Sequence, residues 1–284
     1  MKRTLIFLSI LFLSGMQLVA QQTFKIMTYN IRLDTPDDGQ NAWVFRKDSV
    51  NSFLNKVRPD IFGLQEVVHN QLTDIQKALP NYGFVGVGRA DGKTAGEYSP
   101  VFYLSGKFEK LDEGNFWLSE TPEIPGSKSW DAACERIVSW VCLRVKSSGD
   151  TLYAFNTHFD HIGVAARFNS AGLILENIGK ITGNHAVVLM GDFNSPTDES
   201  AYQRLITDSK TGLNDSRKMF QDNTLKDEIT YTGFDQLPEN DAFIDFIFIN
   251  GRFSSVSSEI KKINDRNFYF SDHLPVVSEI VFVK

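Results

Sequence analysis

The sequence predicts an α/β protein whose sheets contain both parallel and antiparallel strands. Short apolar runs rich in β-branched and aromatic residues alternate with segments in which apolar side chains recur at helical spacing. Between residues 100 and 118, β-rich runs follow one another closely enough to pair as a hairpin, which is typical of antiparallel strands. The two patterns together favour an α/β fold with mixed sheets.

In chain order, the β-rich runs predict strands at residues 24–31, 61–65, 82–87, 100–104, 137–145, 152–156, 186–189 and 243–249. Helices are expected at residues 43–57, 72–79, 165–181 and 201–206, where apolar side chains return every three or four positions. In the first helix these are Val44, Val50, Phe53, Leu54 and Val57. Residues 207–240 are expected to form a long surface excursion with little core of its own. Because no repeat or linker divides the chain, one domain is expected over residues 21–284.

The first twenty residues have the pattern of a secretory signal peptide. Lys2 and Arg3 give a basic start, residues 4–13 are almost continuously apolar, and Ala20 offers a small residue for cleavage. The apolar run is shorter than the roughly 20 residues that a membrane-spanning helix needs. We therefore expect a secreted or periplasmic protein, cleaved near Ala20 and not membrane-spanning, with a retained N-terminal anchor as the alternative.

The composition describes an acidic globular protein. Its 284 residues are 42% hydrophobic, which is enough for one large core. Without Lys2 and Arg3, 27 of the 29 basic residues remain against 35 acidic ones, a formal charge of −8 with histidine neutral. Proteins that hold long nucleic acids usually display a basic stripe, so the acidic balance weighs against a tight duplex binder. No protein partner is implied.

Two cysteines, Cys134 and Cys142, are the only candidates for a disulfide. The stretch between them is expected to be one extended strand, which would separate them by about 26 Å at roughly 3.3 Å per residue. That distance is far beyond disulfide reach. Both thiols are therefore expected to be free and buried.

Polar side chains that can carry acid–base or metal chemistry follow the ends of apolar strands. Asn30, Glu66 and His158 each come directly after such a run, and Asp192 and Asn194 follow another. Strand ends are where α/β folds place their sites. These residues are therefore expected to meet at one edge of the fold.

A further carboxylate, Asp245, interrupts the apolar run at residues 243–249. A carboxylate buried in a strand is costly unless it has a partner. The sequence Ser271-Asp272-His273 offers one, and His273 is the expected partner.

Six segments resemble, in order, the motifs of the endonuclease/exonuclease/phosphatase superfamily. They are Tyr29-Asn30-Ile31-Arg32, Leu64-Gln65-Glu66, Asn156-Thr157-His158, Gly191-Asp192-Phe193-Asn194, Ile244-Asp245 and Ser271-Asp272-His273. The resemblance covers residues 24–275. It implies a deoxyribonuclease-like, four-layer sandwich of two packed mixed β-sheets flanked by helices. It also implies a divalent-metal-dependent hydrolase that cleaves a P–O bond with activated water.

The resemblance implies a metal site and a base. Asn30, Glu66 and Asp272 match the metal ligands, and their hard oxygens suit Mg²⁺, with Mn²⁺ or Ca²⁺ as alternatives. Asp192 matches a carboxylate that activates water or holds a second metal ion, and Asn194 would orient the phosphate or the water.

It also implies two carboxylate–histidine pairs and a phosphate ligand. Asp245 would orient His273. Glu97 matches the position of an acidic residue that, in the deoxyribonuclease branch, partners the other histidine, which is His158 here. Arg136 matches the position of an arginine that contacts phosphate in that branch. Because His158 lies in this same constellation, it is a candidate for both catalysis and substrate binding.

Several functions remain compatible with these residues. A phosphodiesterase or nuclease is expected, with a phosphomonoesterase or a sphingomyelinase-like lipid phosphodiesterase as the alternative. The substrate is then a small phosphodiester, a nucleic acid or a phospholipid head group. Residues 242–247 lack the aromatic-Cys-Asp-Arg signature of the phosphoinositide-phosphatase branch, which is disfavoured. Asp160 and His161 would line the pocket or cap the helix that follows.

A non-catalytic binding module and a secreted adhesion protein are the remaining hypotheses. Either is expected to have lost ligand residues, and none of the six motifs lacks its central residue. The enzyme hypothesis is therefore preferred.

Overall fold

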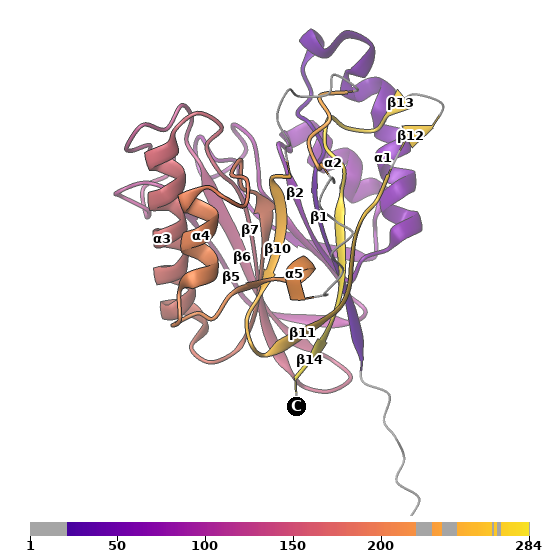
Figure 1. The fold of residues 1–284 in the computed structure, drawn as a ribbon. Coiled ribbons are helices and arrows are strands. Elements are labelled where there is room, and N and C mark those ends of the chain that lie inside the picture. The colour runs from indigo at the N-terminus through magenta and orange to yellow at the C-terminus, as the bar shows by residue number, and fades with distance from the viewer. Residues whose placement is uncertain (1–21, 220–228, 235–242, 263, 266–267, 284) are drawn as a thin grey trace, which may run out of the picture.

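Two packed β-sheets with helices on both outer faces make up the molecule (Figure 1). The structure is a computed structural model that describes residues 22–219, 229–234, 243–262, 264–265 and 268–283. The expectation of a four-layer α/β sandwich with mixed sheets is confirmed. The predicted signal peptide, residues 1–20, lies outside the described residues, so export stays a prediction.

The first sheet has six strands, of which one central pair, β1 and β2, is parallel. Its strands in spatial order are β11 (Phe253–Ile260), β14 (Val276–Phe282), β1 (Thr23–Asn30), β2 (Ile61–Gln65), β4 (Val101–Leu104) and β3 (Tyr82–Val85). In the parallel pair, Asn30 lies opposite Gln65. The carboxyl ends of β1 and β2 therefore lie at the same edge.

The second sheet repeats this arrangement. Its strands in spatial order are β5 (Phe108–Trp117), β6 (Ile137–Val145), β7 (Thr151–His158), β8 (Ala186–Asp192), β10 (Asp245–Ile249) and β9 (Asn214–Asp215). β7 and β8 are parallel, with His158 opposite Asp192. β10 runs antiparallel to β8, and its first residue, Asp245, also pairs with Asp192.

Helices cover the outer faces. α1 (Trp43–Val57) and α2 (His69–Ala78) pack on the first sheet, whereas α3 (Val164–Thr182) and α4 (Ser200–Thr207) pack on the second (Figure 1). The shorter elements are η1 (Pro36–Asn41), α5 (Ser216–Met219) and the small ribbon of β12 (Asn264–Asp265) and β13 (Phe268–Tyr269). α1 ends at a left-handed residue, Arg58, just before Pro59, which cannot continue a helix.

Most differences from the predicted elements lie at their ends. β8 continues through Asp192, three residues beyond the predicted end, and β10 begins at Asp245 instead of residue 243. Val44 was assigned to the buried face of the first helix, but its side chain is 62% exposed. Trp43 is buried in its place.

Further segments depart from expectation. The strands between residues 100 and 118 were expected to pair as a hairpin, but β4 and β5 lie in different sheets. β11 and β14 were not among the predicted strands, and the excursion at residues 207–240 contains β9 and α5. Leu213 and Asp215 of that excursion are buried, so this part contributes to the core. The remaining residues of the excursion at 220–228 and 235–240 lie outside the described residues.

The prediction for the cysteines was right about pairing and wrong about one environment. Both thiols are free. Cys142 is buried in β6, but Cys134 precedes that strand, which begins at Ile137, and is only partly buried. The reason is that the residues before Ile137 lie outside the sheet, where Cys134 lines a pocket.

A buried polar network joins the two sheets beneath the ends of the strands. Gln65 of β2 donates to Asn156 Oδ1 of β7, at 2.6 Å, and to Thr28 Oγ1, at 3.0 Å. Asn156 Nδ2 donates to the carbonyls of Leu64 and Pro100, at 2.8 and 2.9 Å. The bond to Thr28 lies within the first sheet, and the three bonds of Asn156 cross between the sheets and therefore fix their relative position directly below the predicted site.

None of the described helices is long and apolar enough to cross a membrane.

Candidate active site

A pocket of about 300 Å³ opens where β2, β7 and β8 end. Eight predicted residues line it: Glu66, Glu97, Arg136, His158, Asp192, Asn194, Asp272 and His273. The other two, Asn30 and Asp245, are fully buried and hydrogen-bond to residues of the lining. The first sheet supplies Glu66 and the second supplies His158 and Asp192, so the pocket depends on how the sheets stack.

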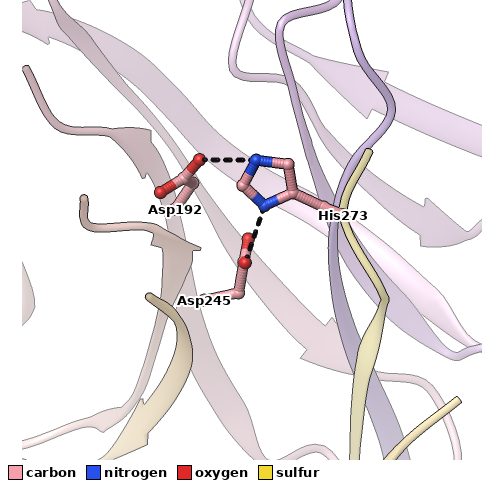
Figure 2. Close-up of side chains that lie close together, drawn as sticks. All are labelled: Asp192, Asp245 and His273. Atoms are coloured by element: carbon pink, nitrogen blue, oxygen red, sulfur yellow. Dashed lines mark hydrogen bonds and ion pairs between the residues drawn. The ribbon is translucent and has the colours of Figure 1, made fainter. Parts of the chain in front are cut away.

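His273 lies between two carboxylates (Figure 2). Its Nδ1 is 2.9 Å from Asp245 Oδ2, and its Nε2 is 3.6 Å from Asp192 Oδ2. All three residues are buried. Thr230 Oγ1 accepts the backbone N–H of Asp245, at 3.2 Å, which fixes the start of β10.

The pKa values of this trio reflect burial and mutual charge. Burial alone lowers the pKa of His273, but the negative charges of Asp245 and Asp192 outweigh it and raise that pKa to about 10. Burial, reinforced by the charge of Asp245, raises the pKa of Asp192 to about 7. His273 is therefore a cation at neutral pH, held between two acidic groups.

Asp192 is shared by both histidines. Its Oδ2 lies 3.5 Å from His158 Nε2, close to the distance to His273. The same oxygen accepts from Asn30 Nδ2, at 3.0 Å, and Oδ1 accepts the backbone N–H of Asn194, at 2.9 Å. This carboxylate is thus oriented from both sheets.

Acidic side chains gather on the side of the pocket that the first sheet supplies. Glu66 Oε1 accepts from Asn30 Nδ2, at 3.0 Å, and Oε2 accepts from Leu33 N, at 3.1 Å. The guanidinium of Arg32 lies 3.7 Å from Glu66 Oε2 and 3.9 Å from Asp272 Oδ2. Burial raises the pKa of Asp272. Arg32 thus brings a positive charge close to both carboxylates.

The donor set at Glu66 and Asp272 fits a hard divalent cation. Both residues offer carboxylate oxygens, the ligands that such cations prefer, and the guanidinium of Arg32 lies within 4 Å of both. Asn30 Oδ1 accepts the N–H of Arg32, at 3.0 Å, and therefore turns its amide nitrogen toward Glu66. A ligand role for Asn30 requires the opposite orientation of that amide.

Among the described residues, the tightest group of possible ligands is a different one: Asp192, Asp245 and His273, whose ligand atoms lie within 4.8 Å of one another. Both nitrogens of the imidazole face carboxylates, and without a bound cation the charges of these carboxylates raise the pKa of His273. A metal ligand must be a neutral imidazole. This group could therefore hold a cation only if His273 lost its proton.

His158 has a different environment from His273. Its Nε2 is 3.0 Å from Asn194 Nδ2, and its Nδ1 is 3.9 Å from Glu97 Oε2, too far for a hydrogen bond. The predicted pair of Glu97 and His158 is thus a close approach only, because Arg89 holds the Glu97 carboxylate with two bonds of 2.7 and 2.8 Å. Burial and the charges of Arg136 and Arg89 lower the pKa of His158 well below its usual range.

Arg136 is fixed by a loop that Asp160 organises. Its Nε lies 3.4 Å from Asp160 Oδ2, and its Nη2 is 2.9 Å from His161 Nδ1. Asp160 also accepts the backbone N–H groups of residues 133, 134, 162 and 163. Of the two uses predicted for Asp160 and His161, His161 lines the pocket and Asp160 binds the backbone just before α3.

Three of the six described non-glycine residues with positive φ lie at the pocket. Arg32, Glu66 and Asn194 have φ values of 57°, 60° and 45°, in the left-handed region that side chains other than glycine rarely adopt. All three line the pocket. Such outliers often mark functional sites, because the surrounding contacts must hold them in place.

Arg32, Tyr231 and Arg89 are among the lining residues that received no role from the sequence. Arg32 belongs to the first motif, two positions after Asn30, so the sequence did contain a signal that Arg32 lies at the site. Tyr231 forms a β-bridge with His273, and their rings lie 5.0 Å apart. Arg89 could not be found from sequence, because its partner Glu97 is eight positions away in an irregular loop.

Comparison with known proteins agrees with the family resemblance and with the fold. The sequence model of the Endonuclease/Exonuclease/phosphatase family matches residues 27–273. An endonuclease/exonuclease/phosphatase from Bacteroides vulgatus is 39% identical, with a TM-score of 0.86, over 93% of this chain and 100% of that one. A mannosyl-6-phosphatase from Bacteroides thetaiotaomicron is 34% identical, with a TM-score of 0.79, over 91% and 100%. The "Probable RNA exonuclease NGL3" of Saccharomyces cerevisiae is 33% identical over 201 residues, 63% of this chain and 39% of that protein.

Proposed function

Because the chain belongs to the endonuclease/exonuclease/phosphatase family, we propose that it is a divalent-metal-dependent hydrolase of small phosphoesters. One observation carries this proposal. A buried Asp192, flanked by His158 and His273, shares a pocket with the carboxylates of Glu66 and Asp272. That arrangement offers a base, cationic and neutral donors, and ligands for a metal ion within one site.

The side chains divide the chemical tasks. Glu66 and Asp272 would hold the cation, with Mg²⁺ the first choice and Mn²⁺ or Ca²⁺ as alternatives. When bound, such a cation neutralises charge on the phosphoryl oxygens. Asp192, oriented by Asn30 and Asn194, is placed to take the proton of the attacking water.

The histidines and Arg136 act on the phosphate. His273, kept protonated by Asp245, supplies a fixed positive charge next to Asp192. His158, together with Asn194, contributes hydrogen-bonding groups near the same carboxylate. Arg136 is held rigidly and can bind phosphate oxygens without reorganising.

Two substrate classes have a specific observation in their favour. The motif pattern favours a phosphodiesterase or nuclease, and the similarity to an RNA exonuclease supports it. The pocket of about 300 Å³ and the similarity to a mannosyl-6-phosphatase along nearly the whole chain favour a phosphomonoester. We propose the phosphomonoester as the substrate, because the acidic net charge of the chain disfavours binding of a polynucleotide.

A substrate panel tests the activity. We would assay p-nitrophenyl phosphate, hexose phosphates, bis-p-nitrophenyl phosphate, plasmid and single-stranded DNA, and sphingomyelin with Mg²⁺, Mn²⁺ or chelator. The control is the double variant Asp192→Ala/His273→Ala. We expect chelator-sensitive turnover, highest on monoesters and lost in the control. Turnover that survives chelation, or binding without turnover of any substrate, would overturn the proposal.

Export is a separate proposal that depends on residues 1–20 alone. The basic start and the apolar run support a signal peptide cleaved near Ala20. Mass spectrometry of the N-terminus from fractionated host cells tests it. A mature chain beginning near Gln21 outside the cytoplasm is expected, and an intact Met1 in the cytoplasmic fraction would contradict it.

A further inference from the structure

One end of the pocket contains buried nitrogen atoms that have no hydrogen-bond partner among the described residues. They are Arg89 Nε, Arg136 Nη1 and His158 Nδ1. All three residues line the pocket and are buried, with exposures of 9%, 4% and 6% for the whole residue. A buried polar group without a partner costs about 1–3 kcal/mol, so this end of the pocket is built to receive ligand atoms or ordered water.

Arg89 stands on a rigid loop. Its backbone N–H donates to Glu97 O, at 2.9 Å, and its carbonyl accepts from Trp117 Nε1, at 2.6 Å. Neighbouring residues pack so closely that a Cβ on Gly88 would lie 2.3 Å from the carbonyl oxygen of Ala95. The two bonds to Glu97 complete the frame. The free Nε therefore has a fixed direction, which is what selective recognition requires.

The charges at this end nearly balance. Arg89 is neutralised by Glu97 and has Glu135 Oε1 4.0 Å from its Nε. Arg136 is paired with Asp160. A second phosphate group on the substrate would meet these carboxylates as well as the arginines, and the repulsion would offset the attraction. The balance favours a neutral group over another anion.

The donors and acceptors match hydroxyl groups. A hydroxyl can accept from a guanidinium N–H and donate to a carboxylate oxygen, so two adjacent hydroxyls can bridge Arg89 and Glu97. A nucleobase would instead need an aromatic platform. Among the described lining residues, the aromatic side chain is Tyr231, which packs on His273.

We propose that Arg89 and Glu97 form a subsite for the hydroxyls of a sugar-like leaving group, and that Arg89 determines the preference for sugar phosphates over aryl and nucleoside phosphates. This proposal rests on the proposed function, because it assigns the leaving group of the same reaction. Arg136, next to this subsite, remains available to the phosphate through Nη1. The subsite gives a role to the ion pair of Arg89 and Glu97, which lines a pocket whose other charged groups are assigned to catalysis.

The test compares two variants with a matched control. Arg89→Lys keeps the positive charge but removes the planar guanidinium and its two parallel hydrogen bonds. Arg89→Met/Glu97→Gln removes both charges, so that no carboxylate is left buried without a partner. Arg144→Met is the control, because Arg144 forms an exposed pair with Glu109, at 3.1 Å, away from the pocket. Circular dichroism verifies that each variant is folded.

The readout is the ratio of kcat/KM for mannose 6-phosphate or glucose 6-phosphate to kcat/KM for p-nitrophenyl phosphate. We expect this ratio to fall at least about tenfold in both Arg89 variants, equivalent to about 1.4 kcal/mol, and to stay unchanged in the control. A ratio that remains within about twofold of the wild-type value in both folded variants would overturn the subsite.

A binding measurement separates this proposal from the proposed function. Mannose 6-phosphate and inorganic phosphate are titrated by calorimetry into the wild-type protein and the Arg89→Lys variant, with Ca²⁺ present. Weaker binding of the sugar phosphate alone in the variant supports the subsite, even if no substrate is hydrolysed. Hydrolysis of p-nitrophenyl phosphate together with equal affinity of both proteins for mannose 6-phosphate would preserve the function and refute the subsite.

Discussion

Replacement of Asp160 by asparagine is expected to destabilise the protein. Asp160 Oδ1 accepts the N–H groups of Ile162 and Gly163, at 3.1 and 2.7 Å. Oδ2 accepts those of Ala133 and Cys134, at 3.0 and 3.1 Å. In Asp160→Asn an amide nitrogen replaces one oxygen and cannot accept from two donors. Two bonds to a charged acceptor, each contributing about 1.5–3 kcal/mol, are lost, so we expect a loss of about 3–6 kcal/mol.

The pH dependence gives a second, independent signature. Burial raises the pKa of Asp160, but the four backbone N–H donors outweigh it and hold that pKa well below its usual value. A carboxyl whose pKa is lower in the folded chain stabilises the fold when ionised. This stability is present above the unfolded pKa of about 3.9 and is lost as pH falls toward the folded pKa. The difference between wild type and Asp160→Asn should therefore be constant from about pH 5 to 8 and shrink below about pH 4.

Equilibrium unfolding in guanidinium, followed by tryptophan fluorescence, measures both effects. Asp150→Asn is the matched control, because Asp150 is an exposed residue in a turn. A change in the free energy of unfolding below about 0.5 kcal/mol for Asp160→Asn would refute the reasoning. So would a difference between the two proteins that grows on acidification.

Three further changes test the site and its support. Glu66→Ala should weaken Mn²⁺ binding at least about tenfold by calorimetry and abolish cation-dependent turnover without unfolding the chain, and unchanged affinity would remove Glu66 from the metal site. Asp245→Asn should lower turnover by about 10²–10⁴-fold and bring the pKa of His273 down from about 10, measured by NMR titration; an unchanged pKa would contradict the pairing. Gly63→Ala should cost about 1–3 kcal/mol in chemical denaturation, because the new Cβ would lie 2.5 Å from Asn156 Cγ, and a neutral effect would show that the network beneath the pocket can shift.

The elements that were easiest to predict are those whose own residues carry the signal. β2 and β8 are buried along their whole length, so each appears in the sequence as a continuous apolar run. β11 was missed because its serine-rich sequence carries little apolar signal, and it is a strand because it pairs with β14. Pairing with a distant segment leaves no mark in a short window of sequence.

The residues of the site can likewise be separated into those that the sequence predicted and those that it could not. Asn30, Glu66, His158 and Asp192 could be proposed from their places at strand ends, since parallel neighbours bring those ends to one edge. The partner of Glu97 could not be predicted from the sequence. The fold places Arg89 closer to the Glu97 carboxylate than His158, and a guanidinium binds a carboxylate more strongly than a neutral imidazole does.

By itself, the sequence determined where apolar strands stop and which acidic, amide and imidazole groups follow them, because strand formation depends on the alternation and burial of adjacent side chains. Only the tertiary structure decided which of those groups touch. Asn30 hydrogen-bonds to Asp192, which is 162 positions away in the chain. That contact exists because the two sheets pack against each other in one relative position. Distances of about 3 Å between residues so far apart depend on the packing of the whole core, which no local segment encodes.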